Sequence, residues 1–276
     1  MMDIKVLQKW IGREESATEQ LTPSLAAKFN ATFDLEAPTD LGSPAPYFVH
    51  YCLAQPCVPT AQLGPDGHPK RGGFLPPVPL PLRMWAGGSC ETLNPISIGD
   101  VVTRRSVIED VAAKEGRSGS LCFVTVRHYF SCGDKLAIRE RQDIVYRTPS
   151  QGEKRKPDAQ APRGAKSKSC AISSPLLFRY SALTFNGHRI HYDAPYARDT
   201  ENYAGLVTHG PLQATLLAHY AAAKKDSRPG LFSYRLLSAI EGGAALELNA
   251  DSAPNGLSLW AAQPGGPVSI KASATW

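Results

Sequence analysis

Three of the seven histidines of this chain, His188, His191 and His209, lie close together in the sequence, and Gly210 and Pro211 follow the last of them. The Leu-, Gln- and Ala-rich run that comes next predicts a helix, and Pro211 suits its first turn. The first N–H groups of a helix have no internal partner, and a glycine lets a substrate oxygen approach them. Histidine has a pKa near neutrality and suits proton transfer with water. The segment therefore predicts a base beside an oxyanion site, as the hydration of an unsaturated thioester requires.

The residues around these histidines form a motif. The chain reads FNGHRIHYD from Phe185 to Asp193 and THG from Thr208 to Gly210. This pattern resembles the signature of the MaoC-like hot-dog hydratases and dehydratases, in which Asp-x-Asn-Pro-x-His-x-Asp is followed by Ala-His-Gly. Nearer the N-terminus, GGFLPPVPLPLRMWAGG and ERQDIVYR resemble the degenerate hot-dog domain that precedes the catalytic one in one branch of that family. The branch includes mitochondrial 3-hydroxyacyl-thioester dehydratases and bacterial itaconyl-CoA and mesaconyl-C4-CoA hydratases.

The resemblance implies catalytic roles for three residues. His191 matches the catalytic histidine of the family, and Gly210 matches the oxyanion glycine. Asn186 stands where the family has a catalytic aspartate, and an amide cannot accept a proton at neutral pH. Asn186 is therefore expected to hold the attacking water or to orient a neighbour, with a structural turn as the alternative. Either His191 carries both proton transfers, or a second acid–base group comes from elsewhere.

Further residues of the segment are candidates for contact with the substrate. His188 replaces the signature asparagine, and Asp193 matches a second aspartate that could orient a histidine ring. Each of these two either lines the site or supports the residues that do. Arg189 could bind a substrate carboxylate or a carrier phosphate, although a surface salt bridge explains it equally well. His209 is expected to position the start of the helix.

The histidines also raise the possibility of a metal site. His-x-x-His without a nearby set of carboxylate or cysteine ligands is weak evidence for zinc. We expect no metal and no separate cofactor, because coenzyme A would be part of the substrate. The six cysteines form no Cys-x-x-Cys pair, which favours free thiols over a zinc ribbon or a disulfide framework.

The composition indicates a soluble globular protein, with 42% hydrophobic and 20% charged residues. A net charge of +5 mildly favours an anionic ligand but is too diffuse to indicate nucleic acid. The N-terminal residues lack the apolar stretch of a signal peptide, and no run is long enough to cross a membrane. We therefore expect a bacterial cytoplasmic location, a homodimer, and a CoA or acyl-carrier-protein thioester as the partner.

The order of elements predicts an α+β fold that occurs twice. In the first half, a helix over 21–33 precedes strands over 101–111, 121–130 and 136–146. In the second half, a helix from Pro211 to Lys225 precedes strands over 231–240, 244–248, 257–262 and 268–275. Together with the resemblance, this order predicts a double hot-dog, with two antiparallel sheets each wrapped around a central helix.

A segment rich in Lys, Arg, Pro, Gly and Ser divides the chain. Residues 148–173 are expected to form a flexible basic linker. Residues 1–147 would then be a degenerate hot-dog domain that supplies a substrate tunnel, and 174–276 the catalytic hot-dog domain. Arg83 and Trp85 are candidates for the tunnel lining, with a structural turn as the alternative.

The function implied by the resemblance is a hydro-lyase that adds or removes water across the C2–C3 bond of an acyl thioester. A small branched substrate, mesaconyl-C4-CoA or itaconyl-CoA going to citramalyl-CoA, is expected from the bacterial members. One alternative is a 3-hydroxyacyl-ACP or -CoA dehydratase of fatty acid metabolism. Two others are a hot-dog thioesterase and an inactive acyl-carrier binding protein. The absence of acidic residues in the predicted helix after Gly210 counts against the thioesterase.

Overall fold

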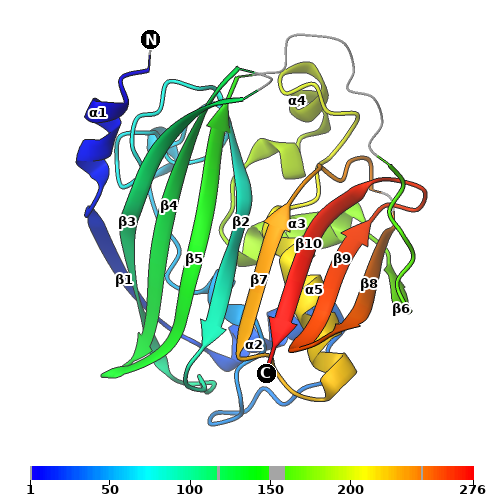
Figure 1. The fold of residues 1–276 in the computed structure, drawn as a ribbon. Coiled ribbons are helices and arrows are strands. Elements are labelled where there is room, and N and C mark those ends of the chain that lie inside the picture. The colour runs from blue at the N-terminus through cyan, green and yellow to red at the C-terminus, as the bar shows by residue number, and fades with distance from the viewer. Residues whose placement is uncertain (1, 117–118, 149–158, 244) are drawn as a thin grey trace.

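The strands of the protein form a single ten-stranded antiparallel sheet in the order β1-β3-β4-β5-β2-β7-β10-β9-β8-β6. The computed structural model describes residues 2–116, 119–148, 159–243 and 245–276 (Figure 1). The strands are β1 (Glu14–Gln20), β2 (Leu82–Thr92), β3 (Val101–Gly116), β4 (Gly119–Cys132), β5 (Lys135–Arg147), β6 (Lys166–Cys170), β7 (Leu231–Leu236), β8 (Leu246–Ala253), β9 (Gly256–Ala262) and β10 (Val268–Thr275).

The two halves of the chain share this sheet, so the expectation of two separate sheets is corrected. Strand β2 pairs with β5 along one edge and with β7 along the other, which joins the halves. Gly87 and Gly88 lie at this junction, where a Cβ on Gly88 would meet the carbonyl oxygen of Arg141 at 2.1 Å and one on Gly87 would meet that of Tyr234 at 2.6 Å. Two adjacent glycines therefore allow β2 to lie closely between both neighbours.

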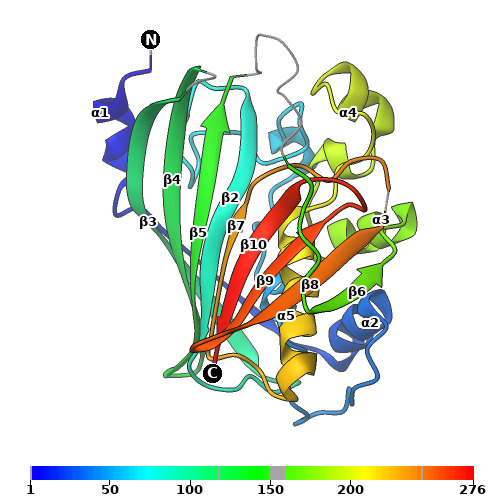
Figure 2. The same cartoon turned by 45° about the vertical axis from the view of Figure 1, so that its right-hand side comes forward.

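The main helices pack on one face of the sheet (Figures 1 and 2). Helix α5 packs against the strands of the second half, as predicted, and buried residues occur all around it. The helices are α1 (Ile4–Leu7), α2 (Pro23–Phe33), α3 (Ser174–Leu183), α4 (Ala194–Asp199) and α5 (Gly210–Lys225), with 3-10 turns η1 (Gln8–Trp10), η2 (Val49–Cys52), η3 (Thr60–Gln62) and η4 (Arg189–His191).

The first half departs from a sheet wrapped around its own helix. Helix α2 forms, but it packs on α3, and the Phe33 and Tyr180 rings meet edge to face at 6.0 Å. Apolar side chains from a Pro- and Gly-rich region, residues 37–88, instead cover part of β3–β5; Val78 and Leu80 are examples. Irregular backbone thus covers part of the sheet in the first half, whereas helix α5 covers the sheet in the second half.

The expected linker contains structure that its composition did not predict. Strand β6 lies within 148–173 and pairs with β8, so the expectation of a loose segment is wrong for these residues. Residues 149–158 of the linker lie outside the described residues. Lys and Ser fit this position because β6 is an edge strand, which tolerates polar side chains on both faces. The division into two domains stays a prediction.

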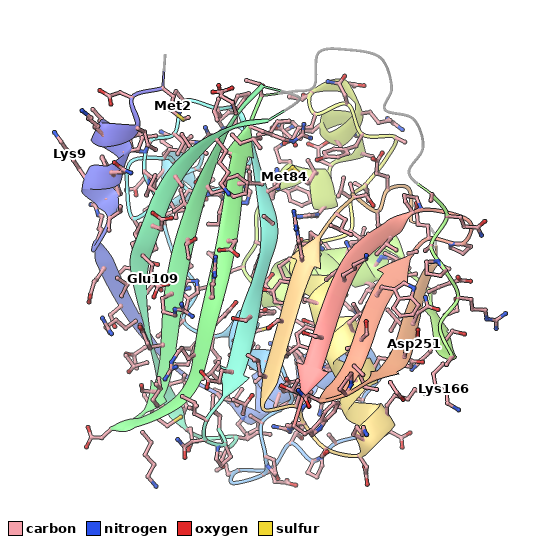
Figure 3. All side chains as sticks on the ribbon, viewed as in Figure 1. Met2, Lys9, Met84, Glu109, Lys166 and Asp251 are labelled. Atoms are coloured by element: carbon pink, nitrogen blue, oxygen red, sulfur yellow. The ribbon has the colours of Figure 1, made fainter. Side chains whose placement is uncertain are left out.

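The face of the sheet away from the helices carries charged side chains. Arg127 makes a two-pronged ion pair with Glu109, which is labelled in Figure 3, and Arg141 pairs with Asp143. Among the described residues, no helix has both the length and the apolar character needed to cross a membrane.

Candidate active site

His191 is the buried centre of the histidine segment. Its Nδ1–H donates to the carbonyl oxygen of Val207 at 2.7 Å, and a carbonyl can only accept, so this bond fixes the tautomer. Burial, and then the nearby His188, lower the pKa of His191 to about 3, whereas the bond to Val207 opposes this shift. The ring is therefore neutral at pH 7. Its Nε2 has no hydrogen-bond partner within the described part of the chain and is free to accept a proton.

His209 links His191 to the start of α5. Its ring stacks on that of His191 with centroids 3.6 Å apart, and its Nε2 is hydrogen-bonded to Ser181 Oγ at 2.8 Å. Burial, followed by the other two histidines, lowers the pKa of His209 well below its ordinary value. Gly210 follows directly as the first residue of α5, so its N–H belongs to the free end of the helix dipole. His191 and the start of α5 thus come together through His209, and the roles of His191 as base and Gly210 as oxyanion donor stay predictions.

His188 is paired with a carboxylate that the motif does not contain. Its Nε2 lies 3.1 Å from Oε1 of Glu201, and the two side chains are only 7% and 8% exposed. The rings of His188 and His191 meet edge to face with centroids 5.3 Å apart. Asn186 accepts a hydrogen bond from the backbone N–H of His188 through Oδ1 at 3.0 Å, which is the turn that the alternative interpretation describes. A catalytic role for Asn186 stays a prediction.

A loop of the first half, residues 64–70, packs against the segment that contains His188 and His191. The backbone N–H of Arg189 donates to the carbonyl oxygen of Asp66 at 2.9 Å. Gly67, with φ +86°, lies against Gly187, and a Cβ on Gly67 would meet the Gly187 carbonyl oxygen at 1.9 Å. This contact brings the ring of His68 to 4.2 Å from that of His188. The first half therefore supplies part of the site.

The glycine contact leads to a stability prediction. Gly67→Ala is expected to destabilise the protein by at least about 2 kcal/mol more than Gly12→Ala. Gly12 is the matched control, because its φ is +83° and a Cβ there would meet nothing within 4 Å. The left-handed backbone alone costs roughly 1–2 kcal/mol in each variant. Urea unfolding of both variants measures the difference, and equal losses would contradict the close packing of the two loops.

Arg189 and Asp193 pair with each other. Both Nε and Nη2 of Arg189 donate to Oδ2 of Asp193, at 2.9 and 2.7 Å, and the guanidinium lies over the Tyr196 ring. The other carboxylate oxygen of Asp193 caps α4 through the N–H of Tyr196. The salt-bridge alternative for Arg189 is therefore the one the structure shows, and Asp193 orients an arginine and a helix instead of a histidine ring.

Arg83 and Trp85 lie on β2, next to the loop that carries His68. Burial and then the positive charge of Arg83 lower the pKa of His68. Burial raises the pKa of Asp66, but the interactions with His68 and, after them, the charge of Arg83 hold it below its ordinary value. Trp85 donates through Nε1 to its own strand at Gly87 and meets the Tyr51 ring at 5.6 Å. Arg83 is thus the arginine that approaches the histidine cluster from the first half.

Three side chains meet the spacing of a metal site. Asp66, His68 and His188 each place one ligand atom within 4.8 Å of the others. However, Nδ1 of His68 is already 3.1 Å from Asp66, and His188 is bound to Glu201. The cation Arg83 also lies nearby and disfavours a second positive charge. These pairings explain the cluster without a metal ion.

Comparison with known proteins identifies the family. A family model described as hydroxyacyl-thioester dehydratase type 2 matches residues 48–241. The chain belongs to this family. Mesaconyl-C(4)-CoA hydratase of Chloroflexus aurantiacus is 41% identical over 272 residues, covering 96% of this chain and 95% of that protein. The mitochondrial hydroxyacyl-thioester dehydratase type 2 of Schizosaccharomyces pombe is 26% identical over 228 residues, covering 71% and 73%. The predicted hydro-lyase class is confirmed.

Solved structures confirm the fold. A MaoC-like dehydratase from Phytophthora capsici matches with a TM-score of 0.70 at 15% identity, covering 99% of both chains. HtdX from Mycobacterium tuberculosis matches with a TM-score of 0.66 at 18% identity, covering 94% of this chain and 99% of that one. A further M. tuberculosis protein, reported to have a double hotdog fold, matches with a TM-score of 0.58 at 12% identity, covering 96% of both chains. The predicted double hot-dog is thus correct.

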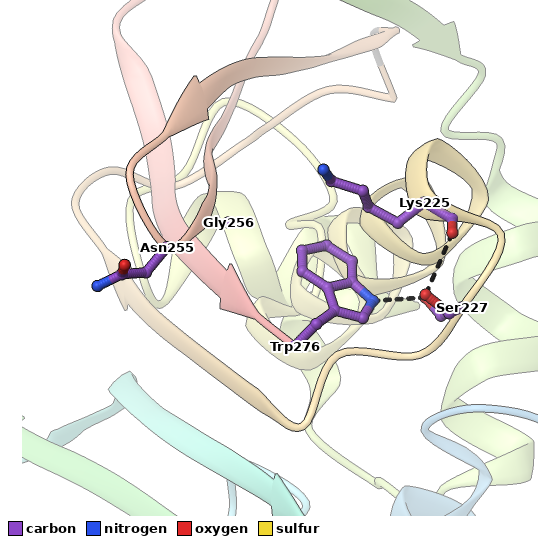
Figure 4. Close-up of a pocket in the computed structure, with 5 residues that line it drawn as sticks. All are labelled: Lys225, Ser227, Asn255, Gly256 and Trp276. Atoms are coloured by element: carbon purple, nitrogen blue, oxygen red, sulfur yellow. Dashed lines mark hydrogen bonds between the residues drawn. The ribbon is translucent and has the colours of Figure 1, made fainter.

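A pocket at the far end of α5 is not part of this site. It is lined by Lys225, Ser227, Asn255, Gly256 and Trp276, and Nε1 of Trp276 donates to the Ser227 carbonyl (Figure 4). None of these side chains suits acid–base chemistry near neutral pH.

The structure adds three residues that the sequence interpretation missed. Asp66 and His68 lie in GPDGHPK, within a region interpreted only as Pro- and Gly-rich, and Glu201 lies in the stretch after the motif. A short carboxylate–histidine pair inside a turn-rich loop is a signal that could have been noticed. Glu201 carried no such signal, because its partner is thirteen positions earlier and only folding brings the two together.

Proposed function

We propose that the protein catalyses the reversible addition of water to a small, branched enoyl-CoA that carries a free carboxylate, converting mesaconyl-C4-CoA to citramalyl-CoA. One observation carries the proposal. His191 is a neutral imidazole whose Nδ1–H is held by Val207, so that Nε2 is left as a base, and its stacked neighbour His209 immediately precedes Gly210. The substrate class is supported by the mesaconyl-C(4)-CoA hydratase of C. aurantiacus, similar over nearly the whole chain.

The geometry performs the reaction as follows. The thioester carbonyl accepts a hydrogen bond from Gly210 N–H, which makes C3 electrophilic. Nε2 of His191 removes a proton from water as the water oxygen attacks C3. The C2–C3 π electrons move toward the carbonyl oxygen to give an enolate, which Gly210 and the α5 dipole stabilise. Protonation at C2 completes the addition, and dehydration follows the same steps in reverse.

Arg83 is the candidate for the free carboxylate of the substrate, because Arg189 is held by Asp193. Arg83→Met is expected to raise KM for mesaconyl-C4-CoA by roughly 10- to 100-fold, since a hydrogen bond to a charged group contributes about 1.5–3 kcal/mol. KM for crotonyl-CoA, which has no carboxylate, is expected to stay near the wild-type value. Steady-state kinetics with both substrates checks this, and an equal rise for both would contradict the role of Arg83.

A second candidate function is the dehydration of 3-hydroxyacyl thioesters, which the S. pombe relative and the family description favour. The experiment that separates the two measures kcat/KM for mesaconyl-C4-CoA, itaconyl-CoA, crotonyl-CoA and a 3-hydroxyacyl-CoA with a longer unbranched chain. Our proposal predicts the highest value for mesaconyl-C4-CoA, and a higher value for the long-chain thioester would replace it with the alternative. The CoA carrier, the homodimer and the cytoplasmic location stay predictions.

Thioester hydrolysis fits the site less well. Helix α5, from Gly210 to Lys225, contains no acidic residue that could serve as a base on the central helix. The inactive-binding alternative is disfavoured by the free Nε2 of His191, which a merely structural histidine would not need.

A further inference from the structure

Hydration requires two proton transfers, one from water and one to C2, and the motif supplies a single obvious base. His191 is neutral and suited to accept the proton from water. Asn186 can neither give nor take a proton, and its Oδ1 is used in a turn. Either His191 returns the proton to C2 itself, or the acid that protonates C2 is another group close to His191.

His188 is the titratable side chain with the right surroundings. Its ring lies 5.3 Å from that of His191, and Glu201 binds its Nε2 at 3.1 Å in a nearly buried pair. A buried carboxylate at hydrogen-bond distance fixes the orientation of the His188 ring, as a proton donor to one carbon atom requires. Nδ1 of His188 makes no hydrogen bond to any part of the chain that the structure describes, so it is available to the substrate.

We propose that His188, positioned by Glu201, is the acid that protonates C2 during hydration and the base that removes this proton during dehydration, whereas His191 acts on the water. This inference rests on the proposed function. Water oxygen bonds to C3, its proton goes to Nε2 of His191, and the π electrons form the enolate. The Nδ1–H bond of His188 then breaks, and its proton forms the new C–H bond at C2. The proton on His191 returns to His188 through solvent, so each turnover adds one water.

The two histidines have different surroundings, as a pair with different roles requires. His191 faces His188 and His209 and has no carboxylate partner among the described residues. His188 faces Glu201 directly and lies against His68. Asp66, Arg83 and His209 are further titratable or charged groups near this cluster, and Tyr196 and Tyr203 lie near Glu201. Two imidazolium ions this close repel each other, so a protonated His188 keeps His191 neutral.

Isotope exchange at C2 separates the two roles. Citramalyl-CoA is incubated with enzyme in D2O, and deuterium at C2 and the loss of water are followed by mass spectrometry. His191→Asn is expected to exchange the C2 proton but to eliminate water roughly 100-fold more slowly. His188→Asn is expected to lose both, because exchange itself needs the base at C2. Normal C2 exchange in His188→Asn would overturn the proposal.

The role of Glu201 is tested by steady-state kinetics and C2 exchange, with thermal unfolding to verify folding. Glu201→Gln is expected to lower kcat and the rate of C2 exchange roughly 10- to 100-fold with little change in KM, with partial rescue in Glu201→Asp. Glu241→Gln is the matched control, because the Glu241 carboxylate accepts from the backbone N–H of Ala204 in a nearby loop, and it should keep wild-type kinetics. Wild-type kcat and C2 exchange in Glu201→Gln would contradict the proposal.

The two proposals fail in different ways. If the wild type hydrates none of the thioesters tested, the proposed function is wrong. If the wild type is active but His188→Asn retains normal C2 exchange, or Glu201→Gln retains wild-type kcat and C2 exchange, only the assignment of the acid is wrong.

Discussion

Replacing His191 by asparagine is expected to lower kcat for hydration roughly 10²- to 10⁴-fold, the usual contribution of a general base. The asparagine amide can still donate to the Val207 carbonyl, as Nδ1 of His191 does, so the loop should keep its shape. What is lost is the lone pair at Nε2. Because burial holds the pKa of His191 at about 3, the base is unprotonated above that pH. The acid limb of wild-type kcat/KM that arises from His191 is therefore expected well below pH 6.

The matched control for this variant is His219→Gln. His219 is a partly buried histidine that also donates to a backbone carbonyl, that of Tyr47, and desolvation lowers its pKa to about 4. It lies on α5, outside the histidine cluster, so its variant should keep wild-type kcat. Steady-state kinetics and thermal unfolding of both proteins make the comparison. A similar fall in kcat for the two variants would show that the loss reflects folding and would remove His191 from the chemistry.

The second large effect concerns Gly210. Gly210→Ala is expected to lower kcat roughly 100-fold, comparable to the loss of one oxyanion donor, because a methyl group at the helix start crowds the thioester. The new Cβ would also lie 2.7 Å from Cδ1 of Leu236. The two effects can be separated, since Leu236 is a flexible side chain that a second substitution can shorten.

The double variant Gly210→Ala with Leu236→Ala decides between the roles of this glycine. If Gly210 is needed for the approach of the substrate, kcat stays low although the contact with Leu236 is relieved. If the glycine only makes room for Leu236, the double variant recovers the kcat of Leu236→Ala alone. Such a recovery would contradict the assignment of Gly210 as the oxyanion donor.

The sequence predicted those helices and strands whose bounds follow from hydrophobic alternation or from residues at a helix start. Strand β10 has the predicted bounds, Val268–Thr275, because Val268, Ile270 and Ala272 alternate with polar residues. Helix α5 begins within one residue of the predicted start, where Pro211 occupies the first turn. By contrast, β2 fell partly within the Pro- and Gly-rich region, and its glycines indicated a turn. The reason for the glycines becomes clear only from the position of β2 between β5 and β7, where they allow close packing of the strands.

The residues of the candidate site likewise fall into those that a local motif contains and those that only tertiary contacts bring to the site. His191, His209 and Gly210 belong to one motif, and they lie next to one another in the structure, whereas their catalytic roles stay predictions. The partners of His188 could not be predicted, because Glu201 reaches it across a turn and His68 arrives from the first half through the Gly67–Gly187 contact. A single sequence contains no direct record of such tertiary contacts.

The most direct test of hydration by His191 is product analysis with mesaconyl-C4-CoA in H2¹⁸O. We expect citramalyl-CoA with ¹⁸O in the C3 hydroxyl group and an intact thioester. The wild type and His219→Gln should form this product, and His191→Asn should form very little of it. Release of free coenzyme A with ¹⁸O in the carboxylate that was the thioester carbonyl, and no hydrated thioester, would contradict it and identify a thioesterase instead.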